Sequence, residues 1–295
     1  MTESVVTAHV VVGVDGSDTA LAAVDWAADA AARRGRPLRI VHAYIWPAMH
    51  LPDGPVSSRE VLAGLRAQAG EYLAQAAGRV TARHPDLRVD PILVEGAAAA
   101  VLLGESRAAA MVVLGHRGLG GFTGLLVGSV GVQVAAHAAC PTVIVRPHLL
   151  PPGPGAGNVV VGVDGAGGSE RALEFAFTEA SLNRVGLTAV HAWRWPLSTE
   201  PGEMLPPVHD PELAGAEEQR VLTEVLAGWQ ERFPDVKVTH HLVAGRAGRA
   251  LIDASPGAHL VVVGSRGRGG FAGLLLGSVS QAVLHHADGT VAIIR

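Results

Sequence analysis

The chain has 295 residues, 48% hydrophobic and 17% charged, which is enough apolar material for two buried cores. Its formal net charge of −4 argues against a general nucleic-acid binder, because such proteins need a basic surface. The single cysteine, Cys140, excludes a disulfide within the chain and a CxxC metal pair, so we expect a small buried apolar residue there. The N-terminus does not resemble a signal peptide.

The first half of the chain alternates β-branched runs with helix-forming stretches. We expect strands at residues 9–15, 38–44, 88–94, 111–115 and 142–145, and helices at 20–34, 60–83, 98–107 and 129–138. The apolar stretch 125–145 is long enough to cross a bilayer, but Gln133, His137 and Pro141 interrupt it. We therefore expect a helix, a turn and a buried strand in that stretch.

The second half of the chain repeats the first at a constant offset of 149 residues. VVGVDG recurs as VVGVDG, VHAYIWP as VHAWRWP, and GHRGLGGFTGLLVGS as GSRGRGGFAGLLLGS, while Arg146 matches Arg295. The repeat predicts two copies of one domain, residues 1–147 and 158–295, joined by a Pro/Gly linker at 148–157. Alternating strands and helices are typical of an α/β domain with a doubly wound parallel sheet.

The two glycine stretches are the candidate ligand sites. In a doubly wound sheet, ligands bind beyond the carboxyl ends of the strands, where both VVGVDG and the glycine stretch fall. Bare backbone before a helix start forms an anion site, and Arg117, Arg266 and Arg268 would add charge for phosphate. Tight packing is the alternative reason for the glycines, and solvated loop charge for the arginines. Ser129 and Ser278 are either helix caps or phosphate ligands.

Two matched pairs of polar residues follow strands. Asp15 and Asp164 would hydrogen-bond a ribose or base, or lie near a phosphate-bound metal, or only form an Asx-turn. His42 and His191 invite a catalytic interpretation, but a histidine at the end of a buried strand is more typical of a hydrogen-bonded core residue.

The pattern Gly-x2-Gly-x9-Gly-Ser after a hydrophobic strand, together with GVDGS after the first strand, resembles the universal stress protein family. The resemblance covers both halves and is greatest to the tandem-domain type of actinobacteria. It implies two Rossmann-like domains similar to adenine-nucleotide alpha hydrolases, each with an ATP site, and Mg²⁺ alongside the ATP. It also implies a cytoplasmic regulator or sensor in stress, dormancy or growth control.

The resemblance assigns nucleotide contacts residue by residue. In the first half they are Gly13, Asp15, Ala43, Gly115, His116, Arg117, Gly118, Leu119, Gly120, Gly121, Gly128, Ser129 and Val130. In the second half they are Gly162, Asp164, Ala192, Gly264, Ser265, Arg266, Gly267, Arg268, Gly269, Gly270, Gly277, Ser278 and Val279. Ser17 becomes Ala166 and His116 becomes Ser265, which predicts unequal affinities of the two sites.

Neither copy has the Gly-Lys-Ser/Thr of a P-loop or a GxSxG elbow, so we assign no catalytic residue and no protein metal ligand. A slow ATPase or nucleotide-activating enzyme is one alternative, and an interaction scaffold with vestigial sites is another. The resemblance further implies pairing of the two domains through their last strands, a homodimer of chains, and an unknown protein partner. We expect no nucleic-acid or membrane partner. The dissimilar loops 47–56 and 196–211 are either lids, partner surfaces or plain solvent loops.

Overall fold

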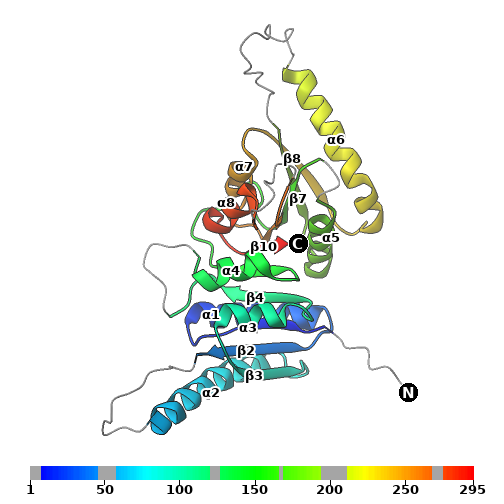
Figure 1. The fold of residues 1–295 in the computed structure, drawn as a ribbon. Helices are drawn as coiled ribbons and strands as arrows, with labels where there is room; N and C mark the ends of the chain where they lie inside the picture. The colour runs from blue at the N-terminus through cyan, green and yellow to red at the C-terminus, as the bar shows by residue number, and fades with distance from the viewer. Residues whose placement is uncertain (1–7, 46–57, 120–126, 166–168, 194–210, 268–274) are drawn as a thin grey trace, which may run out of the picture. The chain divides into compact units, whose positions relative to one another are not determined.

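The structure is a computed structural model that describes residues 8–45, 58–119, 127–165, 169–193, 211–267 and 275–295. The chain divides into two compact units, Met1–Arg146 and Pro147–Arg295. Each unit is an α/β domain, in which helices cover a sheet of parallel strands (Figure 1). The doubly wound α/β fold expected from the sequence is confirmed.

The elements of the first unit follow the expected alternation, and the observed bounds lie within a few residues of the expected ones. They are β1 (Val10–Gly13), α1 (Asp18–Arg33), β2 (Leu38–Tyr44), α2 (Ser58–Arg83), β3 (Val89–Glu95), α3 (Ala98–Glu105), β4 (Met111–Gly115), α4 (Ser129–His137) and β5 (Thr142–Val145).

The sheet of the first unit has the strand order β3-β2-β1-β4-β5, and its strands are parallel. Val10 lies opposite Leu38 on one side and Met111 on the other, and all three side chains are buried. Central strands covered on both faces need apolar residues throughout, which explains the unbroken β-branched run in β1. Pro91 lies in β3, at one end of this strand order, where a missing N–H is tolerated.

Helices α1 and α2 pack against each other, and α3 packs against α4. Right-handed crossovers put the first pair on one face of the sheet and the second pair on the other. Two bidentate ion pairs join α1 to α2, with Arg79 holding Asp25 at 2.6 Å and Arg83 holding Asp29 at 2.8 Å. The stretch read as helix, turn and strand contains α4 and β5, as expected. No helix in the described part of the chain is long and apolar enough to cross a membrane.

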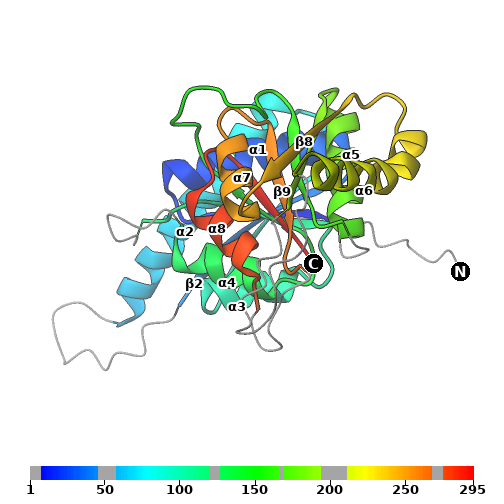
Figure 2. The same ribbon diagram turned by 90° about the horizontal axis from the view of Figure 1, so that it is seen from above.

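The second unit has the same element order and the strand order β8-β7-β6-β9-β10. Its elements are β6 (Val159–Val163), α5 (Glu170–Asn183), β7 (Leu187–Trp193), α6 (Pro211–Arg232), β8 (Val238–Ala244), α7 (Ala247–Ala254), β9 (Leu260–Gly264), α8 (Ser278–His286) and β10 (Val291–Ile294). Helices α7 and α8 lie side by side, and α5 contacts α6 (Figure 2).

Most of the expected linker packs on the second unit. The backbone N–H groups of Gly153 and Gly157 donate to the carbonyls of Pro256 and Gly257, each at 2.8 Å. The N–H of Leu149 donates to Asp288 Oδ1 at 2.7 Å. These bonds tie the segment to the residues that follow α7 and α8. Its prolines and glycines therefore form turns that pack against the second unit.

Burial makes Cys140 inert. The residue is 8% exposed, and burial raises the pKa of its thiol to about 11. The thiolate needed for nucleophilic attack or metal binding is therefore scarce at neutral pH. The expectation of a small buried apolar residue is confirmed.

Phe177 anchors α5 to α6 in the second unit. Its side chain is fully buried, and its ring centroid lies 5.9 Å from that of Trp229 and 5.5 Å from that of Phe233. We predict that Phe177→Ala lowers the free energy of unfolding of the second unit by about 3–5 kcal/mol, because a large cavity replaces the ring. Urea denaturation followed by circular dichroism measures this. The matched change Leu213→Ala, at a side chain 71% exposed on α6, should cost under about 0.5 kcal/mol.

Candidate functional site

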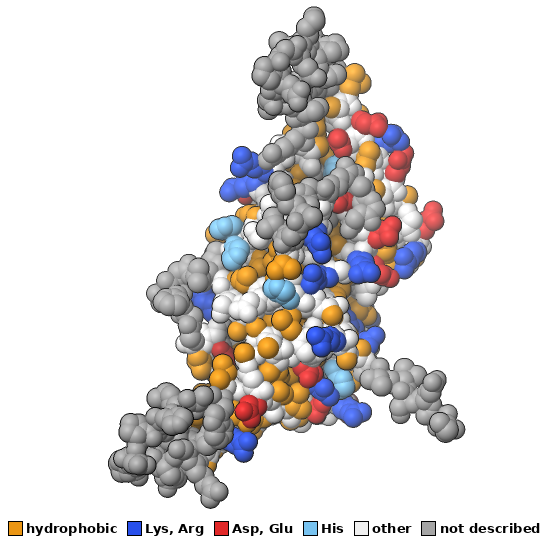
Figure 3. Space-filling model, viewed as in Figure 1, with side chains coloured by type: hydrophobic (Ala, Val, Ile, Leu, Met, Phe, Trp, Pro, Cys, Tyr) orange, Lys and Arg blue, Asp and Glu red, His pale blue; other side chains and the backbone are white. Residues whose placement is uncertain are grey.

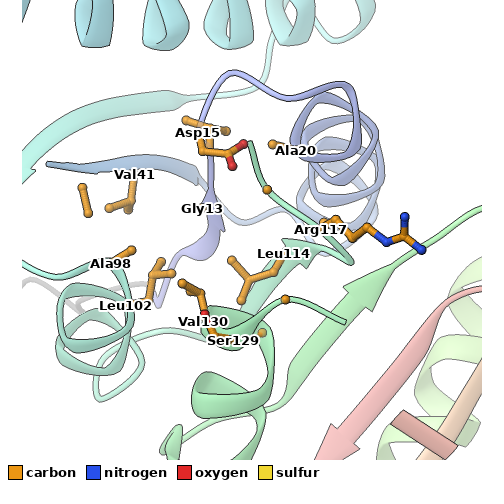
Figure 4. Close-up of a pocket in the computed structure, with 16 residues that line it drawn as sticks. Gly13, Asp15, Ala20, Val41, Ala98, Leu102, Leu114, Arg117, Ser129 and Val130 are labelled. Atoms are coloured by element: carbon orange, nitrogen blue, oxygen red, sulfur yellow. The ribbon is translucent and has the colours of Figure 1, made fainter. Parts of the chain in front are cut away.

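A cavity of about 270 Å³ lies at the carboxyl ends of β1, β2 and β4 in the first unit (Figure 4). The side chains of Val41, Leu102, Leu114 and Val130 supply apolar walls. Of the residues assigned from the sequence, nine line this cavity: Gly13, Asp15, Ala43, Gly115, Arg117, Gly118, Gly128, Ser129 and Val130. Residues far apart in sequence thus meet where a doubly wound sheet binds its ligands.

The glycines of the first loop have different physical reasons. A Cβ on Gly115 would lie 2.6 Å from the carbonyl oxygen of Thr19, so close packing against the start of α1 requires this glycine. A Cβ on Gly13 would lie 2.6 Å from Leu114 Cδ2, which is also a packing constraint. Around Gly128 the nearest atom would be 3.8 Å away, an ordinary contact. Packing therefore explains Gly13 and Gly115 but leaves Gly128 unexplained.

Asp15 joins the first strand to the glycine loop. Its Oδ1 accepts hydrogen bonds from the backbone N–H of Ser17 at 3.0 Å and from the hydroxyl of Ser17 at 2.6 Å. Its Oδ2 accepts the N–H of Leu119 at 2.8 Å, and a Cβ on Gly118 would lie 2.2 Å from this oxygen. Thr19 adds a second link, since its hydroxyl donates to the carbonyl of Arg117. Asp15 thus forms the Asx-turn and also holds the loop.

The start of α4 points bare backbone at the cavity. Its N-cap is Gly128, with φ −71° and ψ 158°, and no side chain caps the helix. The first N–H groups of a helix have no partner within it, so those of Ser129 and the next two residues are available to a ligand. Interpreting Ser129 and Ser278 as the N-caps is wrong, because Gly128 and Gly277 hold the cap positions of α4 and α8. The serines are the first residues of these helices.

The side chains of Arg117 and His116, both expected to lie near phosphate, do not bring positive charge into the cavity. In Figure 4 the guanidinium of Arg117 points away from the space enclosed by Asp15, Leu114 and Val130. His116 is not among the lining residues, and burial, then the charges of Arg117 and Arg146, lower the pKa of its imidazole below the usual 6.5. His116 is therefore neutral at pH 7 and adds no positive charge to the cavity.

The second unit repeats the backbone but not every contact. Asp164 Oδ1 accepts the hydroxyl of Ser169 at 2.6 Å, and a Cβ on Gly267 would lie 3.9 Å from Asp164 Oδ2. Gly162 packs on Leu251, where a Cβ would be 3.0 Å from its Cδ1.

Four further assigned residues of the second unit lie at the ends of strands. Gly264 ends β9 and is followed by Ser265 and Arg266, while Ala192 lies near the end of β7. Val279 is the second residue of α8. The assigned residues Gly120, Gly121, Arg268, Gly269 and Gly270 lie outside the described residues.

The two matched histidines have structural partners. Nδ1 of His42 lies 2.8 Å from the carbonyl of Val14, and Nδ1 of His191 lies 2.8 Å from the carbonyl of Val163. Nε2 of His191 also lies 2.9 Å from Glu218 Oε2, on α6. His42 does not line the cavity, whereas its neighbours Val41 and Ala43 do, as expected where successive side chains alternate between the faces of a sheet.

The apolar wall was missed by sequence reasoning. Val41, Ala98, Leu102 and Leu114 carry no polar group, so their composition gives no functional signal. The alternation within β2 places Val41 and Ala43 on one face, which was the available clue. The described residues contain no group of three or more His, Cys, Asp or Glu side chains suited to a metal ion.

The fold defines each unit as a parallel α/β domain, and in the first unit a cavity lies at the carboxyl ends of the strands. The family model of the universal stress protein family matches residues 7–146 and again 156–295. The universal stress proteins Rv2623 and Rv2005c of Mycobacterium tuberculosis are 39% and 40% identical to the chain over 297 and 293 residues. In both cases the match covers 97% of this chain and 96% of the relative.

A solved universal stress protein from Archaeoglobus fulgidus has a similar fold. Its TM-score is 0.68 at 19% identity, and the match covers 98% of this chain and 96% of that one. The chain belongs to the universal stress protein family, with two copies of the family domain in tandem. The resemblance seen in the sequence is thereby confirmed.

Two single substitutions test which glycines of the first loop are required by packing. We predict that Gly115→Ala lowers the free energy of unfolding of the first unit by about 1–3 kcal/mol, because the new methyl group would overlap backbone atoms of α1. Gly128→Ala should cost less than about 1 kcal/mol, since only the N-cap preference is lost. Urea denaturation of both variants measures the difference. Equal costs would contradict the assignment of Gly115 to packing.

Proposed function

We propose that the cavity of the first unit binds ATP, that the second unit holds a related site, and that the protein is a nucleotide-dependent regulator. The observation that carries the proposal is an apolar cavity with the uncapped start of α4 at one end. Small-molecule sites combine apolar walls with a few directed polar groups, and an uncapped helix start is suited to phosphate.

The lining residues divide the cavity into a base end and a phosphate end. Val41, Ala43, Ala98 and Leu102 offer apolar surface for a purine ring. The backbone N–H groups that open α4 would bind phosphate oxygens. Asp15 lies at the end of β1, where its carboxylate would accept a ribose hydroxyl. The backbone thus supplies the phosphate contacts that the sequence reading gave partly to the side chains of His116 and Arg117.

Asp15 is also the acidic residue among those lining the cavity, so it would hold a Mg²⁺ ion that accompanies the nucleotide. The ion would neutralise phosphate charge. Asp15 and Arg117 are the only ionisable side chains lining the cavity in the described chain, and the Arg117 guanidinium points away. The Asp15 oxygens are engaged by Ser17 and Leu119, and the described lining holds no other carboxylate or imidazole to act as a general base, which favours binding over rapid hydrolysis.

The regulatory step follows from Asp15. Its Oδ2 holds Leu119 in the structure, and a ribose hydroxyl or Mg²⁺ would compete for that oxygen. Nucleotide binding would thus release or reposition the glycine loop, converting occupancy into a change of surface. We place this regulator in the cytoplasm, in stress, dormancy or growth control, as a homodimer with a protein partner. Pairing of the two domains through their last strands is part of the same proposal.

Filling the base end tests the proposal. We predict that Ala43→Leu abolishes ATP binding by the first unit, because the larger side chain occupies the apolar end of the cavity. Isothermal titration of the full chain should show two ATP per wild-type chain and one per variant. Ala82→Leu, at an exposed position on α2, is the matched control and should bind two. ATP assayed after denaturing the purified protein reveals nucleotide carried through purification. No binding by any form would refute the proposal.

The two sites should differ in affinity. His116 is replaced by Ser265 and Ser17 by Ala166, and the Ser17 hydroxyl donates to Asp15 Oδ1 at 2.6 Å in the first unit. One net hydrogen bond is worth about 1 kcal/mol, so we predict dissociation constants at least about fivefold apart. Ala192→Leu isolates the first site and Ala43→Leu the second. Two indistinguishable constants would contradict this prediction.

A further inference from the structure

A second cavity lies in the second unit, and it shares Gly264, Ser265 and Arg266 with the residues assigned to the second nucleotide site. It has a volume of about 230 Å³ and lies where β9 and β10 end beside the first turn of α5. Arg171, Arg266 and Arg295 line it, together with Ser265 and Glu170. Neither Asp164 nor Gly277, which match two lining residues of the first cavity, lines this one.

The charge of this cavity is unbalanced toward positive. Three guanidinium groups face the carboxylate of Glu170 and the terminal carboxylate of Arg295, an excess of one positive charge. On the face seen in Figure 3, blue side chains gather where β10 ends beside α5. The start of α5 adds the positive end of a 14-residue helix, and no side chain caps it.

The side chain of Arg171 is also held in place. Nη1 of Arg171 donates to the backbone oxygen of Arg295 at 3.1 Å, which fixes one guanidinium against the end of β10. A guanidinium carries five N–H donors in a fixed plane, so this bond leaves most of the Arg171 fork for a ligand. The backbone around Ser265 is anchored as well, because its N–H donates to the carbonyl of Ile294 at 2.6 Å.

The first unit has arginines at two of the three matching positions. Arg117 and Arg146 lie 149 residues before Arg266 and Arg295, and Arg146 is only 9% exposed. Buried Nε of Arg117 and buried Nδ1 of His116 have no hydrogen-bond partner in the described part of the chain. A buried donor without an acceptor costs about 1–3 kcal/mol, and an oxyanion beside these side chains would remove that cost. Nucleotide binding at the first cavity does not use the Arg117 guanidinium, which points elsewhere.

We propose that the cavity between the ends of β9 and β10 and the start of α5 binds a phosphate group, beside the second nucleotide site and at the same time as ATP. Arg171, Arg266 and Arg295 bind its oxygens. The positive excess attracts an anion, and the oxygens of phosphate accept the paired N–H donors of arginine. The first unit offers a smaller version built on Arg117, Arg146 and His116. The ligand is free phosphate or the phosphate of a small metabolite.

Titration of the full chain with inorganic phosphate, in a chloride buffer of constant ionic strength, tests the site. The double variant Arg171→Gln, Arg295→Gln should weaken phosphate binding by the second unit at least about tenfold, since two charged hydrogen-bond donors are lost. The control is Arg249→Gln, which removes a 74% exposed arginine from α7 and should bind like the wild type. Should the double variant melt early, Arg171→Gln alone, at an exposed position, replaces it.

A second titration, at saturating ATP, separates this site from the nucleotide cavity. Wild-type protein should still bind phosphate. Loss of phosphate binding on adding ATP, or equal binding by the double variant and the control, overturns the proposal, as does no binding at all. Absence of ATP binding would refute only the proposed function, because the ATP-free titration decides this site. Glycerol 3-phosphate binding more tightly than inorganic phosphate would identify a metabolite as ligand.

Discussion

The close approach of the end of β4 to the first turn of α1 is the constraint on which the first site depends. A Cβ at Gly115 would overlap the Thr19 carbonyl, so the strand meets the helix through backbone alone. This contact brings the next residues within reach of α1, where Thr19 bonds the carbonyl of Arg117 and Asp15 bonds the N–H of Leu119. The chain after β4 is therefore directed toward α1, and the cavity stays open between β1, β4 and α4.

The fold followed from local patterns in the sequence. The β-branched run of β1 and the alternation in β2 report burial directly, because a strand covered on two faces differs in composition from one covered on one. The constant offset between the halves predicted two copies without any knowledge of their contacts. Glycine spacing indicated the candidate site, since glycine at a strand end either meets a conformational or packing constraint or lets the backbone approach a ligand.

Side-chain direction was beyond the reach of such patterns. The bond from Asp15 to Leu119 spans 104 residues, and nothing in either segment specifies it. Arg117 lies in the glycine loop, yet its guanidinium points away from the cavity, a direction that the loop sequence does not specify. His191 pairs with Glu218, while the first copy has Ala69 at the matching position, so the repeat gave no warning. The docking of residues 149–157 on the second unit likewise depends on distant carbonyls.

The duplication separates what the fold requires from what a site requires. Gly118 and Gly267 occupy matching positions, but a Cβ would be 2.2 Å from Asp15 in one copy and 3.9 Å from Asp164 in the other. The glycine is thus retained where its packing reason is weak, which points to a need for bare backbone near a ligand. The same logic applies to the arginines after the fourth and fifth strands. Arg117 and Arg266 match, as do Arg146 and Arg295, although their neighbours His116 and Ser265 differ. Positive charge at these strand ends is therefore a shared property of the two copies, independent of the neighbouring side chains.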